Sequence, residues 1–264
     1  GLLTAGFFAF LNTRLEQKKR EEMEEKMTLM RSTLAEYIKD LPDKPDVVDG
    51  SGNVIESFAH TRWNTANAFE DDAIHYPCPA PLTAKIGDAN FGVESRDNAT
   101  GRCDASVAGV FQVTGASGQR VFIGTFPTAT LGIGSDNMED PYRSKYLYAV
   151  SDMPSRTMAL DGANPAGAIT VNDRSDISSP EIITAEFVIL SHGEDRKGSY
   201  LFESDVRFSN CTGSEADQEN CDLNDATFSV ELRSEGNNND YFDDTLAFTF
   251  VEADQSGNSF LPDC

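Results

Sequence analysis

The first 27 residues, GLLTAGFFAFLNTRLEQKKREEMEEKM (residues 1–27), change from almost wholly apolar to almost wholly charged without an intervening turn residue. From Leu2 to Leu41, apolar residues recur mostly at three- and four-residue steps, which predicts one long helix. Pro42 cannot continue a helix and marks its end. At about 1.5 Å per residue this helix measures roughly 60 Å, more than the diameter of a small domain. Part of it is therefore expected to project.

Three parts of this helix favour different surroundings. The apolar start is shorter than the roughly 20 apolar residues that span a bilayer. Positive charges follow it, whereas in a secretory signal peptide they precede the apolar run. The charged segment from Glu16 to Lys26 predicts a solvated spacer, and a later apolar stripe predicts docking on a globular head. The stripe consists of Met27, Met30, Leu34 and Ile38. The apolar start is either a buried core helix or the end of a membrane segment; its large apolar residues are Leu2, Leu3, Phe7, Phe8, Phe10 and Leu11.

Composition narrows the class of protein. The 264 residues are enough to bury a sizeable core, in one domain or two. Asp and Glu number 44 against 21 Lys and Arg, and the net charge of −23 opposes nonspecific binding to nucleic acid or anionic lipid. A well-solvated surface explains this charge most simply, with divalent-cation binding or a salty medium as alternatives. Five cysteines at loop-like spacings indicate an oxidising, external compartment.

After the helix, the pattern predicts a loop over residues 42–56 and a second helix from about Ser57 to Asp71. From Pro81 onward, strands and turns dominate, and stretches such as TFSVEL alternate apolar with polar residues as half-buried antiparallel strands do. The fold class is therefore α+β. The predicted strands are Arg120–Phe126, Lys145–Val150, Ala168–Val171, Ile182–Leu190, Ala226–Leu232 and Thr245–Val251.

Several blocks of the sequence occur in an informative order. The long helix ends in LAEYI, and YPCPAPLTAKIGDANFGVE, GRC, GTFPTATLGI, DPYRSKYLYAVS, AEFVILSHGEDRKGSY and YFDDTLAF follow. Together they resemble bacterial type IV pilin-like proteins and pseudopilins, which carry a prepilin-type N-terminus. The resemblance implies a protruding helix (residues 1–41) whose second half packs on the antiparallel sheet of a globular head (residues 42–264). It also implies that about a dozen residues precede Gly1.

The function that the resemblance implies is that of a structural subunit in an extracellular type IV pilus-like filament on a bacterial surface. Such a subunit is anchored in the inner membrane before assembly, has a methylated N-terminus, and is polymerised by an assembly machinery. The apolar residues between Leu2 and Leu11 would then pack against helices of other copies. The alternatives are a pseudopilin of a type II secretion machine and a minor tip subunit that serves as an adhesin or binds a ligand. None of these is an enzyme.

Two insertions depart from the family pattern, at about Lys39–His75 and at NCTGSEADQENCDLND (residues 210–225). Both are expected on the outer surface of the head, where loops vary and carry contacts.

The five cysteines suggest two disulfides and one remaining thiol. The resemblance implies that Cys78 pairs with Cys103. Cys211 and Cys221 bracket an acidic loop, which predicts a local bridge, although metal ligation is an alternative. Cys264 is left over: it is free, joins a neighbouring subunit, or displaces one member of the second pair.

The acidic stretch EGNNNDYFDD (residues 235–244) is the best metal candidate in the sequence. Its hard oxygen ligands are closely spaced, and we expect Asp240, Asp243 and Asp244 to hold calcium, although Asn and Asp also populate ordinary turns. No other cofactor is expected. The Ser191-His192-Gly193 triplet predicts a turn after a strand, because adjacent strand residues point to opposite faces and cannot form a nucleophile and base pair.

Overall fold

A computed structural model describes residues 2–40, 47–48, 54–56, 76–97, 103–152, 167–175, 181–212, 214–234, 241–249, 252–253 and 259–260. Several sequence predictions lie outside these residues: the helix at Ser57–Asp71, the position of Asp240, and the pairing of Cys264.

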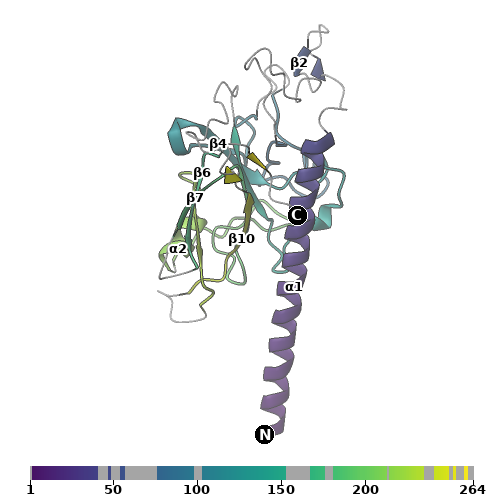
Figure 1. The fold of residues 1–264 in the computed structure, drawn as a ribbon. Helices are drawn as coiled ribbons and strands as arrows, with labels where there is room; N and C mark the ends of the chain where they lie inside the picture. The colour runs from purple at the N-terminus through teal and green to yellow at the C-terminus, as the bar shows by residue number, and fades with distance from the viewer. Residues whose placement is uncertain are drawn as a thin grey trace.

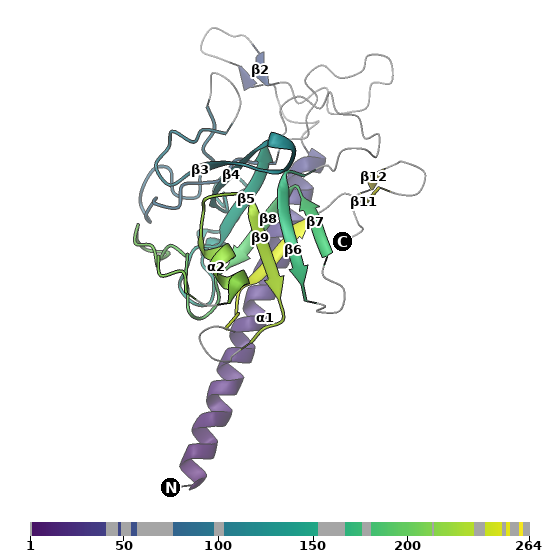
Figure 2. The same ribbon diagram turned by 90° about the vertical axis from the view of Figure 1, so that its left-hand side faces the viewer.

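The long N-terminal helix α1 (Leu2–Asp40) is present as predicted. Its C-terminal half lies along the head, while its N-terminal half extends away from it (Figures 1 and 2). The buried stripe recurs at steps of four, three and four residues, so its members share one face of the helix. These buried residues are Met23, Met27, Met30 and Leu34. Together with the β-sheets of the head, this helix confirms the predicted α+β class.

The charged segment from Glu16 to Lys26 is not a fully solvated spacer, so that prediction was wrong. Met23 within it is buried against the head, and the Lys26 ammonium donates hydrogen bonds to the carbonyls of Asp136 (3.1 Å) and Glu139 (2.9 Å). Charged side chains with long aliphatic stems can line such a contact while their heads find polar partners.

The centre of the head is a five-stranded antiparallel sheet with the order β10-β8-β5-β4-β3. Residues alternate between its two faces, as the pleat requires. One face packs against α1 through Phe122, Tyr148 and Ile189, whereas the other carries Val121 and Val188 toward a second sheet. The strands are β3 (Phe111–Thr114), β4 (Arg120–Thr125), β5 (Leu147–Asp152), β8 (Phe187–Ser191) and β10 (Thr245–Thr249).

The second sheet has the order β7-β6-β9 and forms a further layer on the side away from α1 (Figure 1). Its strands are β6 (Ile169–Arg174), β7 (Glu181–Ala185) and β9 (Thr227–Glu231), and the short helix α2 (Glu215–Cys221) packs beside β9. The antiparallel expectation fails for β9, because β9 pairs with β6 in parallel, with Thr170 opposite Thr227.

The predicted strand Ile182–Leu190 is two strands in different sheets, so that prediction was also wrong. The chain leaves β7 at Ala185 and enters β8 at Phe187. Between them, the buried Glu186 carboxylate accepts a hydrogen bond from the Tyr76 hydroxyl at 2.7 Å. Glu186 separates the two strands, so one apolar stretch of the sequence contributes a strand to each of the two sheets.

The remaining described elements are short. They are β1 (Val47–Val48) paired with β2 (Val54–Glu56), β11 (Glu252–Ala253) paired with β12 (Ser259–Phe260), and the 3-10 turns η2 (Ala116–Gly118) and η3 (Ser135–Met138).

Candidate functional site

The projecting half of α1 exposes large apolar side chains. Phe10 is 56% exposed, Leu11 43% and Leu15 53%. The backbone is helical from Leu2, so the apolar residues predicted to pack in a filament, Leu2, Leu3, Phe7, Phe8, Phe10 and Leu11, follow one another on a continuous helix. Of these six, the structure describes the side chains of Phe10 and Leu11.

No helix within the described residues is both long enough and apolar enough to cross a membrane.

The junction between the projecting and packed halves is held by polar contacts. The Tyr142 hydroxyl donates to the Glu16 carboxylate at 3.2 Å, and the Lys19 ammonium lies 4.8 Å from the centre of the Tyr142 ring. Burial acts to raise the pKa of Glu16, but the hydrogen bond and charge of Lys19 outweigh it, so the pKa is lowered overall. These contacts fix where the helix leaves the head.

Both predicted disulfides are present. Cys78 pairs with Cys103, and Cys103 packs against the core that also holds the buried stripe of α1. Cys211 pairs with Cys221 and closes the acidic insertion at the end of α2. The insertion was expected to be a loop, yet it forms this helix.

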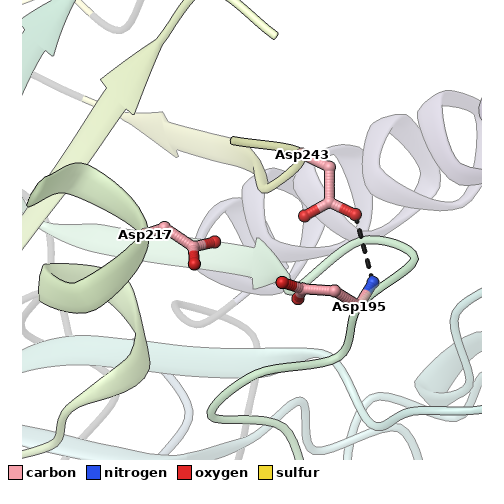
Figure 3. Close-up of side chains that lie close together, drawn as sticks. All are labelled: Asp195, Asp217 and Asp243. Atoms are coloured by element: carbon pink, nitrogen blue, oxygen red, sulfur yellow. Dashed lines mark hydrogen bonds between the residues drawn. The ribbon is translucent and has the colours of Figure 1, made fainter. Parts of the chain in front are cut away.

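A cluster of carboxylates gathers beside α2. Asp195 lies in the turn after β8, Asp217 lies on α2, and Asp243 lies just before β10 (Figure 3). One potential ligand oxygen from each of these three residues lies within 4.8 Å of the other two. Asp217 and Asp243 are each only 1% exposed. Carboxylate oxygens are hard ligands of the kind that calcium takes, and these three would supply part of its shell of about six to eight oxygens.

Local structure explains why Asp217 lies at the start of α2 and why the turn after β8 comes close to Asp243. The Ser214 hydroxyl caps α2 by accepting from the backbone N–H of Asp217 at 3.1 Å, which places Asp217 in the first turn. Gly193 has a φ of 61°, and a Cβ at this position would lie 2.5 Å from the Asp243 carboxylate. Only glycine therefore allows the turn after β8 to approach Asp243 this closely.

The two oxygens of Asp243 differ in their surroundings. Oδ2 accepts hydrogen bonds from the backbone N–H groups of Glu194 and Asp195 and from the Tyr241 hydroxyl at 3.0 Å. Oδ1 is buried and has no hydrogen-bond partner among the described residues. In Figure 3 this second oxygen lies on the side of the carboxylate that faces Asp217. A buried acceptor without a donor is costly unless a cation satisfies it.

One cation already lies in the cluster. The Lys197 ammonium is 2.6 Å from Oδ2 of Asp195 and 3.1 Å from Oδ2 of Asp217. Burial acts to lower the pKa of Lys197, but its hydrogen bonds to these two carboxylates raise that pKa overall. Lys197 is thus a protonated counter-ion for Asp195 and Asp217.

A single lysine does not neutralise the cluster. Burial, followed by the charge on Asp195, raises the pKa of Asp217 to about 6. The same two causes raise the pKa of Asp243, and burial together with the charge on Asp217 raises the pKa of Asp244. The protein alone therefore holds these groups in an environment that resists full ionisation.

The calcium ligands predicted from sequence are distributed differently. Asp243 belongs to the cluster, and Asp240 lies outside the described residues. Oδ2 of Asp244 accepts from the Asn220 side chain at 2.9 Å, while its Oδ1 is buried without a hydrogen-bond partner in the described chain. Sequence reasoning missed Asp195 and Asp217, because both are remote in the chain from Asp243.

The Ser191-His192-Gly193 triplet ends β8 in a turn, as predicted. The Ser191 hydroxyl donates to the Asp140 carboxylate at 2.8 Å. Neither imidazole nitrogen of the buried His192 has a hydrogen-bond partner among the residues described. Burial, followed by the charge of Arg207, lowers the pKa of His192 to about 3.

The sequence matches no protein-family profile, and neither a curated protein nor a solved structure shows significant similarity to the chain.

Proposed function

We propose that this chain is the structural subunit of an extracellular type IV pilus-like filament and polymerises through the projecting half of α1. The observation that carries the proposal is the exposure of Phe10, Leu11 and Leu15 on a helix that continues away from the head. Removing such side chains from water is worth about 1.5–3 kcal/mol each. Contacts between helices of neighbouring subunits would recover this free energy at every step of the filament.

The head has features that suit the outside of such a filament. Two disulfides favour an oxidising compartment. The net charge of −23 keeps heads soluble and discourages contacts other than those that helix packing enforces. Before assembly, the apolar segment would reside in the inner membrane and be handed to an assembly machinery.

The polar contacts at the junction support the same assignment. Glu16 and Lys19 tie the helix to the head at Tyr142, and Lys26 ties it to carbonyls in η3 and just after it. A helix held in this way transmits the position of its projecting half to the head. In a filament, that connection would set the spacing of heads along the surface.

The test is electron microscopy of surface fibres from cells that express the full precursor with its assembly machinery. Replacing Phe10 and Leu11 with Asp should abolish fibres, because unpaired charge would be buried between helices. The control is Ile182→Asp, which puts a carboxylate of the same kind on an apolar side chain that is 78% exposed on β7. Fibres should persist in this control.

Normal fibres from the Phe10→Asp, Leu11→Asp variant would overturn the proposal. Fibres of the wild type in which antibody against the head labels only the ends would also overturn it, in favour of a tip subunit. Short periplasmic filaments in place of surface fibres would instead favour a secretion pseudopilin.

A further inference from the structure

We propose that Asp195, Asp217 and Asp243 form a calcium site that joins three segments of the head and stabilises its outer layer. None of the three ligands comes from α1, so the inference is independent of filament formation. It differs from the grouping that local sequence suggests, because its three ligands come from the turn after β8, from α2 and from the segment before β10.

The free oxygen of Asp243 is the observation that points to a ligand. Its Oδ2 is saturated by the N–H groups of Glu194 and Asp195 and by the Tyr241 hydroxyl, whereas the buried Oδ1 has no hydrogen-bond partner within the described structure. The side of Asp243 that carries this oxygen faces Asp217 (Figure 3). The three backbone and phenol donors orient the carboxylate, and an ion would complete its coordination.

The spacing of the oxygens distinguishes between hard cations. Calcium binds oxygen at about 2.3–2.6 Å, so two ligand oxygens of one ion lie at most about 5 Å apart. The candidate oxygens of the cluster fall within 4.8 Å of one another. Around magnesium, at about 2.0–2.1 Å, the limit is roughly 4.2 Å and the geometry is stricter. The upper bound of 4.8 Å for the cluster is therefore inside the calcium limit and above the magnesium limit.

Charge balance fits a divalent cation. The three carboxylates carry three negative charges when ionised, and the Lys197 ammonium, in contact with Asp195 and Asp217, supplies one positive charge. The remaining charge of −2 matches one divalent cation. Lys197 contacts Oδ2 of both partners and does not pair with Asp243, so the ion and the lysine would share the cluster.

The position of the site explains what the ion would do. Asp217 lies on α2, which the Cys211–Cys221 disulfide closes at one end. The ion would tie that helix to the turn after β8 and to the start of β10, which belong to the central sheet. Calcium and the disulfide would thus fasten the same insertion from two sides.

The first measurement is the melting temperature of the full chain in chelator, in about 10 mM calcium and in about 10 mM magnesium. Calcium at about a hundred times its Kd should raise Tm by about 5–10 °C, whereas magnesium should raise it by less than about 2 °C. Asp217→Asn should abolish the calcium shift. Glu215→Gln is the matched control: it removes the same charge from the same helix, but at a side chain that is 84% exposed, and should keep the shift.

A second readout is luminescence, which the wild-type protein itself provides. Terbium replaces calcium at oxygen sites, and the Tyr241 hydroxyl hydrogen-bonds Asp243, so excitation of tyrosine should sensitise terbium emission. Tyr241→Phe should remove most of this emission. Calcium should displace the terbium at lower concentration than magnesium does.

A variant of Lys197 tests the alternative that this lysine is the only cation of the cluster. If the lysine is the only cation of the cluster, Lys197→Gln will be destabilised and calcium will not restore its Tm. If the site binds calcium, the variant should show a larger calcium shift than the wild type, since the ion then meets three uncompensated carboxylates. A wild-type Tm that is identical in chelator and calcium, or terbium emission that survives Tyr241→Phe unchanged, would overturn the proposal.

Discussion

The two halves of α1 both carry large apolar residues, yet their surroundings differ. In the packed half, Met30 and Leu34 are fully buried against the central sheet. In the projecting half, Phe10 and Leu11 are about half exposed, and the helix continues away from the head. The packed residues recur on one face, whereas Phe10 and Leu11, adjacent in the sequence, point to different sides of the helix. One face suits one sheet, and several faces suit several neighbouring helices.

Under the proposed function, one secondary-structure element stabilises a fold at one end and an assembly at the other. The packed half lowers the free energy of its own head. The projecting half would gain its stabilisation only from other subunits. Substitutions should therefore separate the stability of the head from polymerisation.

The largest expected effect separates the halves directly. Leu34→Asp should destabilise the head by more than about 5 kcal/mol, because it puts an unpaired charge into the helix-facing core. Leu11→Asp should change the stability of the isolated subunit by less than about 0.5 kcal/mol. Chemical denaturation followed by the near-UV circular dichroism of the head measures both. Equal destabilisation by the two changes would erase the distinction between the halves.

The disulfides should differ in their influence on the packed half. In the entropic model, removing the Cys78–Cys103 bond, with a sequence separation of 25, costs about 3.5 kcal/mol. Because Cys103 packs in the helix-facing core, this loss should speed hydrogen exchange in α1 from Met23 onward. Replacing Cys211 and Cys221 with Ala serves as the control and should leave that exchange slow, since the bond fastens α2. Faster exchange in α1 of the control would contradict this division.

His192 should make the head that supports the packed half more sensitive to acid. Burial lowers the pKa of His192 from 6.5 to about 3, so the unfolded chain binds a proton that the folded protein refuses. The resulting contribution to the free energy of unfolding is fully present above pH 6.5 and is lost as the pH falls toward 3. The loss amounts to about 3 kcal/mol near pH 4. His192→Leu breaks no hydrogen bond between the imidazole and a described residue, and it should remove this sensitivity.

The measurement is the difference in unfolding free energy between the wild type and His192→Leu at pH 7 and pH 4. Taking the difference cancels the opposite response of Asp140, whose pKa burial raises to about 6. A constant difference across this range would show that His192 does not contribute to the acid response.

The smallest expected effect lies at the junction. Tyr142→Phe removes the hydrogen bond to Glu16 and should cost at most about 1 kcal/mol. Hydrogen exchange should accelerate only in the helix between Glu16 and Met23. A variant that unfolds the whole head would mean that the junction is part of the core and not a separate hinge point.

Sequence periodicity predicted α1 and its docking stripe well, because a repeat of three and four residues maps directly onto one helix face. The stripe begins one turn earlier than expected, at Met23, which is surrounded in sequence by charged residues. The division of residues 182–190 into two strands had no local signal, since the apolar pattern continues through the single carboxylate of Glu186.

The candidate site was less accessible to sequence reasoning. Asp243 was predicted from its acidic surroundings, but Asp195 and Asp217 lie more than twenty residues away along the chain and from each other. Only the tertiary arrangement brings them together. A local signal did exist for α2, since Ser214 followed by acidic residues is typical of a helix start.

The central claim is that the projecting half of α1 is an assembly surface, and a cryo-EM reconstruction of fibres formed by this subunit tests it most directly. The account predicts that Phe10 and Leu11 contact α1 helices of neighbouring subunits in the filament core, with the heads outside. A reconstruction in which these side chains face solvent while the heads alone make the contacts would contradict it.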